Sequence, residues 1–160
     1  MKKINVDDLE WEIWASPKGK FRGDIKEISA ALGAKRNSPV GSGGHAFDLA
    51  LERLAPGASA CPYHRHAAQT EMFYILSGDG SVRADGATFA VRAGDVVLHP
   101  PGEAHQIINA GSEDLVYAII ADNPPVDVCD YPDSNKTGIF GESTRRLVRT
   151  SDVDYWDGEE

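Results

Sequence analysis

Residues 71–99, with the sequence EMFYILSGDGSVRADGATFAVRAGDVVLH, consist of short apolar or alternating runs separated by turn residues. The runs are Met72–Leu76, Gly80–Ala84, Thr88–Arg92 and Asp95–His99. The pair Asp85-Gly86 separates two alternating runs and is typical of a type I′ hairpin turn, in which both central residues take a positive φ. This stretch therefore predicts consecutive short antiparallel strands.

The same pattern continues on both sides of this stretch. From His45 onward the chain alternates with period two, with Phe47, Leu49 and Leu51 on one face. Two further strand-like runs, His105–Asn109 and Leu115–Ala121, follow Pro100-Pro101-Gly102 and Ala110-Gly111. Because no helical pattern of 10–15 residues lies between the runs, a parallel βαβ sheet is disfavoured. The pattern predicts an all-β sandwich or barrel.

The flanking segments are less regular. Ile25, Ile28 and Leu32 lie at helical spacing and predict a short helix over residues 24–35, and residues 138–149 could add a strand or two. The chain has 160 residues, which is the size of one domain of about 150 residues. We expect an extension over residues 1–44 that packs on a barrel, the barrel over 45–122, and a second extension over 123–160.

The composition excludes several classes of protein. The formal net charge is −9, from 25 acidic and 16 basic side chains, which argues against binding to nucleic acid or an anionic membrane. Cys61 and Cys129 are the two cysteines and form no disulfide framework, and residues Met1–Trp14 have no apolar signal core. We expect a cytoplasmic protein whose partner is a small molecule.

Three histidines and one glutamate have the composition of a metal site. His64 and His66 are two residues apart, so on a strand both imidazoles face the same side. Glu71 begins the next apolar run, and His105 follows the Pro-Pro-Gly turn. Three imidazoles and a carboxylate suit a divalent first-row metal and leave positions for water or substrate. The spacing of the two neighbouring histidines alone would also be compatible with surface or hydrogen-bonded residues.

The residues around these four resemble the two motifs of the cupin superfamily. The first, G-x6-H-x-H-x4-E-x6-G, runs from Gly57 to Gly78, with one residue more than usual between Gly57 and His64. The second, G-x5-P-x-G-x2-H-x3-N, runs from Gly94 to Asn109. The resemblance implies a double-stranded β-helix, or jelly-roll, barrel and commonly a homodimer. It also implies one divalent ion (Zn, Mn, Fe or Ni), for which the ligands by position are His64, His66, Glu71 and His105.

The chain looks like small single-domain bacterial cupins, some of which are described as sugar-phosphate isomerases. That resemblance implies isomerisation of a sugar or sugar phosphate, with the metal as Lewis acid. Alternatives are an Fe(II)-dependent dioxygenase and a non-catalytic small-ligand-binding protein. No residue identifies itself as the catalytic base.

Further residues are candidates for substrate contacts or structural roles. The candidates for lining a substrate pocket are Arg53, Tyr63, Phe73 and Tyr117. Arg53 is included because an arginine on an apolar strand could clamp a carboxylate or phosphate, although a surface arginine is an equal alternative. We expect His99 at the rim or outside the barrel, and Asn109 in turn or ligand-supporting hydrogen bonds.

Overall fold

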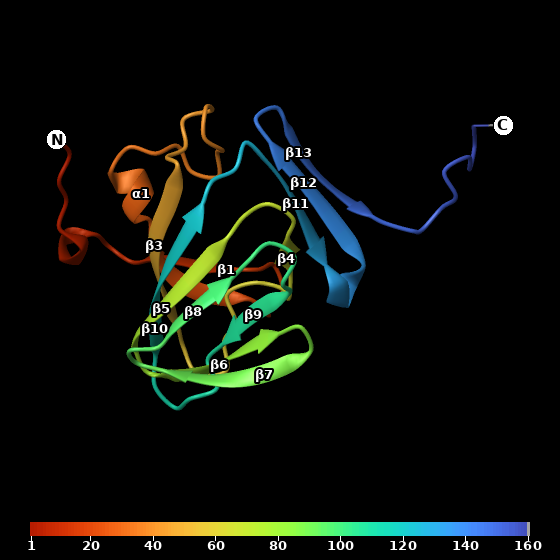
Figure 1. Cartoon of the computed structure of the whole chain (residues 1–160). Helices are drawn as coiled ribbons and strands as arrows, with labels where there is room; N and C mark the ends of the chain where they lie inside the picture. The colour runs from red at the N-terminus through yellow and green to blue at the C-terminus, as the bar shows by residue number, and fades with distance from the viewer. Residues whose placement is uncertain (160) are drawn as a thin grey trace.

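Two curved layers of antiparallel strands face each other in the computed structural model, which describes residues 1–159 (Figure 1). The first layer is a six-stranded sheet with the order β1-β2-β3-β10-β5-β8. Its strands are β1 (Glu12–Ala15), β2 (Arg22–Lys26), β3 (Phe47–Leu54), β10 (Leu115–Asp122), β5 (Glu71–Ser77) and β8 (Val96–His99).

The second layer consists of two sheets joined by isolated bridges. One has the order β7-β6-β9, and the other β13-β12-β11-β4. The bridges Ser59↔Ile108 and His64↔His105 place residues 59–64 beside β9, and thereby connect the two sheets. The strands are β4 (Arg65–His66), β6 (Asp79–Ala84), β7 (Ala87–Arg92), β9 (His105–Ile108), β11 (Val126–Tyr131), β12 (Lys136–Gly141) and β13 (Thr144–Arg149). The all-β jelly-roll prediction is confirmed.

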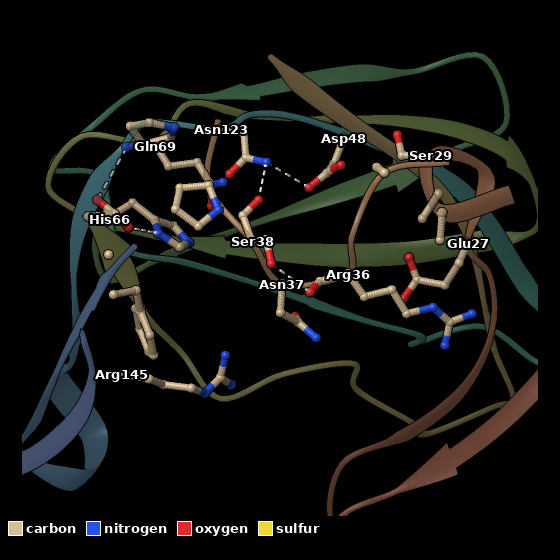
Figure 2. Close-up of a pocket in the computed structure, with 18 of the residues that line it drawn as sticks. Glu27, Ser29, Arg36, Asn37, Ser38, Asp48, His66, Gln69, Asn123 and Arg145 are labelled. Atoms are coloured by element: carbon tan, nitrogen blue, oxygen red, sulfur yellow. Dashed lines mark hydrogen bonds and ion pairs between the residues drawn. The ribbon is translucent and has the colours of Figure 1, made fainter. Parts of the chain in front are cut away.

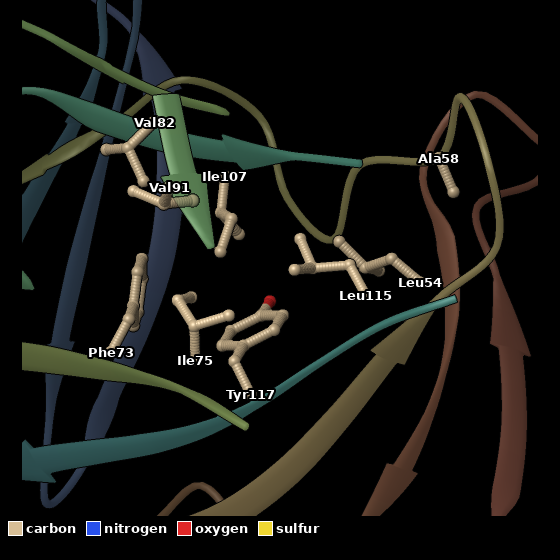
Figure 3. Close-up of a cluster of buried hydrophobic side chains, with 9 residues drawn as sticks. All are labelled: Leu54, Ala58, Phe73, Ile75, Val82, Val91, Ile107, Leu115 and Tyr117. Carbon is tan, nitrogen blue, oxygen red and sulfur yellow. The ribbon is translucent and has the colours of Figure 1, made fainter. Parts of the chain in front are cut away.

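The hydrophobic core lies between the layers and follows the alternation of the strands. Phe73 and Ile75 of β5 face inward, as do Leu115 and Tyr117 of β10. The buried cluster comprises Leu54, Ala58, Phe73, Ile75, Val82, Val91, Ile107, Leu115 and Tyr117 (Figure 3). Because successive side chains of a strand alternate between faces, Glu71 shares the inner face of β5 with Phe73 and Ile75.

The hairpin predicted at Asp85-Gly86 is confirmed. Asp85 has a φ of 42° and Gly86 a φ of 84°, as a type I′ turn requires, and Ala84 pairs with Ala87 across the turn.

The prediction of a helix over residues 24–35 is wrong in most of its length. Residues Arg22–Lys26 form β2, in which Ile25 pairs with Glu52 of β3, and the helix α1 is limited to Ile28–Ala31. Sheet pairing with a distant strand thus outweighs the local helical spacing. Within residues 1–159 no helix is long and apolar enough to span a membrane.

The flanks contribute strands to the sheets, and the strand or two expected within residues 138–149 is confirmed by β12 and β13. β1 and β2 extend the first layer, and the antiparallel strands β11, β12 and β13 extend the second. Two short 3-10 helices, η1 (Val6–Asp8) and η2 (Pro132–Ser134), complete the elements.

Candidate metal centre

Backbone pairing brings the two histidine motifs together. The N–H of His64 donates to the carbonyl of His105 at 3.1 Å, and the N–H of His105 donates to the carbonyl of His64 at 2.7 Å. His66, two residues on, lies in β4 and pairs with Cys129 of β11. Glu71 opens β5 in the opposite layer and faces the barrel interior. The pairing therefore directs the three imidazoles toward this carboxylate.

The four predicted ligands meet around the Glu71 carboxylate. His105 Nε2 lies 2.8 Å from Glu71 Oε2, and His64 Nε2 lies 3.9 Å from the same oxygen. His66 Nε2 lies 3.9 Å from Glu71 Oε1. His64 and His105 are buried, and the side chains of His66 and Glu71 are only 13% and 16% exposed. The structure thus brings together three nitrogen donors and one carboxylate in a protected position.

Each imidazole is oriented through its other nitrogen. Nδ1 of His64 lies 2.9 Å from the carbonyl of Pro62, and Nδ1 of His105 lies 3.3 Å from the carbonyl of Glu103. Nδ1 of His66 lies 2.5 Å from Asp127 Oδ2. An acceptor at Nδ1 favours the tautomer whose Nε2 lone pair is free to bind a metal.

The Nε2 atom of His66 is buried and has no hydrogen-bond partner within residues 1–159. Buried polar atoms are nearly always paired, so this unpaired nitrogen beside a carboxylate fits the position of a metal ligand. The donor set of three imidazole nitrogens and one carboxylate suits zinc, iron, manganese or nickel. The residues therefore fit a divalent metal.

The charge states of Glu71 and His64 favour metal binding. Burial would raise the pKa of Glu71, but its hydrogen bond with His105 and the nearby His66 and His64 lower that pKa to about 2. Burial lowers the pKa of His64 to about 4, so its imidazole is neutral at pH 7. A charged carboxylate and neutral imidazoles are the forms that bind metal.

Cys129 offers a second grouping, because its Sγ lies within 4.8 Å of ligand atoms of His64 and His66. Burial raises the pKa of the Cys129 thiol to about 12. Since the thiolate is the form that ligates metals, Glu71 is the better fourth ligand at neutral pH.

Asp127 contacts the candidate ligand His66 and was not identified from the sequence. Its Oδ1 accepts the N–H groups of Ala68 at 2.8 Å and Gln69 at 3.4 Å, while its Oδ2 contacts His66. Burial opposes its negative charge, yet the hydrogen bond with His66 lowers the pKa of Asp127. Asp127 lies 61 residues after His66, so no local pattern relates the two residues.

The prediction for His99 is wrong. His99 is 1% exposed, and its ring stacks on that of His105 with centroids 4.0 Å apart and an interplanar angle of 11°. The reason is register: His99 pairs with Glu71, so both side chains take the inner face. Glu103 Oε1 holds His99 Nδ1 at 2.6 Å.

None of the four residues expected to line a substrate pocket borders the cavity that opens beside His66, and Arg53 lines a different pocket next to Trp14 and Asp24. Arg53 points to the outer face of β3, where it pairs with Asp24 at 2.5 Å and stacks over Trp11 at 4.6 Å. Its charge is thus already compensated away from the metal centre. Tyr63 is buried beneath the Arg83 guanidinium, which lies 3.6 Å from its ring centroid.

Phe73 and Tyr117 belong to the hydrophobic core. Phe73 lies beneath the metal centre, with its ring centroid 5.8 Å from that of His105. The hydroxyl of Tyr117 is buried among the core side chains without a partner in residues 1–159. Asn109, in contrast, makes the predicted turn bonds: its amide donates to the carbonyls of Leu54 and Glu113 and accepts the N–H of Gly111.

A cavity of about 330 Å³ opens beside His66 and Asp127 (Figure 2). We call it the His66 cavity. One wall comes from α1 and the loop that follows it, and the other from the β12–β13 hairpin. Its polar side chains include Glu27, Arg36, Asn37, Asp48, Gln69, Asn123 and Arg145. A small polar molecule in this cavity would lie next to one ligand of the metal centre.

Known proteins are similar to this chain in sequence and in fold. A family model described as "Cupin domain" matches residues 50–121. The oxalate-binding protein of Thermotoga maritima is 37% identical over 72 residues, which cover 45% of this chain and 59% of that protein. The chain spans about half the length of the curated relatives it matches.

Two solved structures resemble almost the whole chain. One, from Acidithiobacillus ferrooxidans, is provisionally assigned as a sugar phosphate isomerase; it has a TM-score of 0.79 and 25% identity, and the match covers 93% of this chain and 90% of that one. The other, a sugar phosphate isomerase of the cupin superfamily from Silicibacter pomeroyi, has a TM-score of 0.76 and 20% identity, with 93% of each chain covered. With the two motifs, the jelly-roll barrel and the match to the family model, residues 50–121 of the chain form a cupin domain.

Proposed function

We propose that this protein is a metal-dependent enzyme that isomerises a small sugar or sugar phosphate. The observation that carries the proposal is the convergence of three oriented imidazoles on the Glu71 carboxylate, directly beside a polar cavity of about 330 Å³. Overall similarity to the Acidithiobacillus structure, over 93% of this chain, supports the same reaction class.

The chain supplies both the candidate metal ligands and a residue that orients one of them. His64, His66, Glu71 and His105 would be its ligands, and Asp127 fixes the ring of His66 through Nδ1. When bound, a divalent metal acts as a Lewis acid toward a carbonyl or hydroxyl oxygen of the substrate. Because the Glu71 carboxylate would bind the metal, it would not be free to accept a proton. A different group must therefore move the proton between the two carbons that are exchanged in an aldose–ketose pair.

Asp48 is our candidate for that proton transfer. It pairs with Ala121 of β10, which in turn pairs with Glu71, so Asp48 and Glu71 share one inner row two strands apart. At the usual strand spacing this separation is about 10 Å between Cα atoms. Asp48 lines the His66 cavity, and burial raises its pKa toward the range useful to a general base. Its carboxylate would take the proton from the carbon beside the carbonyl and return it to the former carbonyl carbon, while the proton of the adjacent hydroxyl group moves to the former carbonyl oxygen.

The test begins with metal content and turnover. Purified protein is analysed for stoichiometric divalent metal and then assayed for aldose–ketose interconversion with a panel of sugars and sugar phosphates. Glu71→Gln should lose metal and turnover, whereas Glu113→Gln, an equal change at an exposed position, should lose neither. Asp48→Asn should retain metal but lose turnover.

Three outcomes would overturn the proposal. Absence of stoichiometric metal, together with equal metal uptake by Glu71→Gln, would remove the metal centre. Oxygen consumption with Fe(II) and no isomerisation would instead identify a dioxygenase, for which the same donor set is suited. Tight ligand binding by the metal-loaded protein without any turnover would identify a binding protein.

A further inference from the structure

The basic side chains of the His66 cavity differ in whether their charge is already compensated. Arg36 donates through two guanidinium nitrogens to the two carboxylate oxygens of Glu12. Arg145 also lines the cavity, but forms no ion pair within the part of the chain that the structure describes. Arg145 is therefore the cation of this cavity that is available to a ligand.

Strand register connects Arg145 to the metal centre. Asp127 pairs with Phe140 on β12, and Phe140 pairs with Arg145 on β13, so the three side chains form one row across one face of the sheet. Asp127 holds the metal ligand His66 at one end of this row. Arg145 stands at the other end, about 10 Å away between Cα atoms at the usual strand spacing. A small molecule bound by the guanidinium would therefore lie on the same face of the sheet as Asp127, which holds His66.

Phe140 supports the guanidinium between these two ends. Arg145 Cζ lies 5.2 Å from the Phe140 ring centroid, within the range of a cation–π contact. Such a contact restricts the guanidinium without using its N–H donors, which remain free to bind oxygen atoms.

The charges around the cavity determine where an anion would bind. Glu27 and Asp48 lie at the far side of the cavity from Arg145 (Figure 2). Asp127 is closer, but its carboxylate is occupied by His66 and two backbone N–H groups. An anionic group is therefore attracted to the Arg145 end and repelled from the Glu27 end. The acidic end is suited to hydroxyl groups, which can donate to a carboxylate.

We propose that Arg145 binds the phosphate group of a phosphorylated sugar in the His66 cavity, while the carbonyl end of the sugar reaches the metal centre. This inference rests on the proposed function and names its substrate class. A guanidinium matches the oxygens of a phosphate in a bidentate manner, as lysine does not. Arg145 is thus a specificity-determining residue and not a group that moves protons.

The test compares Arg145→Gln with Arg146→Gln. Arg146 pairs with Ile139 and so occupies the opposite face of β13, which makes it a control with the same charge change one residue away. For the metal-loaded protein, Arg145→Gln should raise KM for phosphorylated sugars about 10- to 100-fold, the usual effect of losing hydrogen bonds to a charged group. It should leave kcat and KM for the unphosphorylated sugars nearly unchanged, and Arg146→Gln should behave as the unsubstituted protein.

A direct binding measurement separates this inference from the proposed function. Inorganic phosphate is titrated into the three proteins by calorimetry, and Arg145→Gln alone should bind it more weakly. If no sugar turns over, the proposed function fails, whereas phosphate binding still decides the role of Arg145. Equal phosphate affinity in Arg145→Gln, or an equal loss in Arg146→Gln, would overturn the inference. A larger effect of Arg145→Gln on sugar acids than on sugar phosphates would overturn the assignment of phosphate.

Discussion

Replacement of Asp127 by Asn tests whether this residue orients a metal ligand. In the protein, Asp127 Oδ1 accepts backbone N–H groups of Ala68 and Gln69, and Oδ2 contacts His66 Nδ1 at 2.5 Å. Asparagine has a single oxygen. If that oxygen keeps the backbone bonds, the amide NH₂ faces His66 Nδ1 and donates to it. The proton of His66 then moves to Nε2, the atom that should bind the metal.

The expected loss follows from this change of tautomer. Residues that support a histidine ligand typically contribute 10- to 100-fold to metal affinity, about 1.4–2.7 kcal/mol. The other ligands, His64, Glu71 and His105, keep their own partners, so the site should be weakened and not abolished.

Metal affinity is measured by competition with a chromophoric chelator at fixed pH, with thermal unfolding to confirm that each variant is folded. Asp130→Asn is the control. Asp130 lies on the same strand, but its carboxylate binds Arg65 at 3.2 Å and is 36% exposed. Unchanged affinity in Asp127→Asn would refute the role of Asp127, as would an equal loss in Asp130→Asn.

Three further predictions concern stability. Glu52 is 3% exposed and accepts the Trp14 Nε1–H at 2.9 Å, and burial raises the pKa of Glu52 from 4.5 to about 7. Because the folded-state pKa is the higher one, the free energy of unfolding of the wild-type protein should fall as the pH rises from about 4.5 to about 7. In urea unfolding, Glu52→Gln should be more stable than the wild-type protein by about 3 kcal/mol at pH 8, but not at pH 4.5. An equal difference at both pH values would contradict this reasoning. Asn109→Ala removes three hydrogen bonds from a fully buried side chain and should lower the free energy of unfolding by about 3 kcal/mol; a loss below about 1 kcal/mol would mean that these bonds contribute little. Gly86→Ala should lower it by about 1–2 kcal/mol through backbone strain alone, since φ is 84° and no atom lies within 4 Å of the added Cβ, and an unchanged midpoint would show that the turn relaxes without strain.

The barrel strands were predictable because their signals are local. Alternation in β3, the Asp85-Gly86 turn and the Pro-Pro-Gly turn before His105 all act within a few residues. β2 was not predictable, because its backbone hydrogen bonds go to β3, about 25 residues further along the chain. The strand or two expected within residues 138–149 are present as β12 and β13, whereas β11 was missed, because Asp127 and Asp130 interrupt its apolar pattern and only its pairing with β12 and β4 reveals it.

The four candidate ligands, His64, His66, Glu71 and His105, could be identified from residue types and spacings. The residues that orient these ligands, such as Asp127 beside His66, could not be predicted from the sequence. Arg53 and Arg145 both belong to strands, and only the pairing shows that Arg53 is bound to Asp24 outside the barrel while Arg145 lines the His66 cavity. His99 was misplaced because its face depends on its register with Glu71.

The sequence by itself determined the class of fold and the four side chains suited to a metal, because turn residues, strand alternation and the His-x-His spacing are properties of short segments. Only the tertiary structure decided that Asp127 holds His66 and that Arg145 is available in the cavity beside them. Those relations join residues of separate strands, and the physical reason is that strand register, which selects the neighbours of each side chain, is set by the packing of the whole barrel.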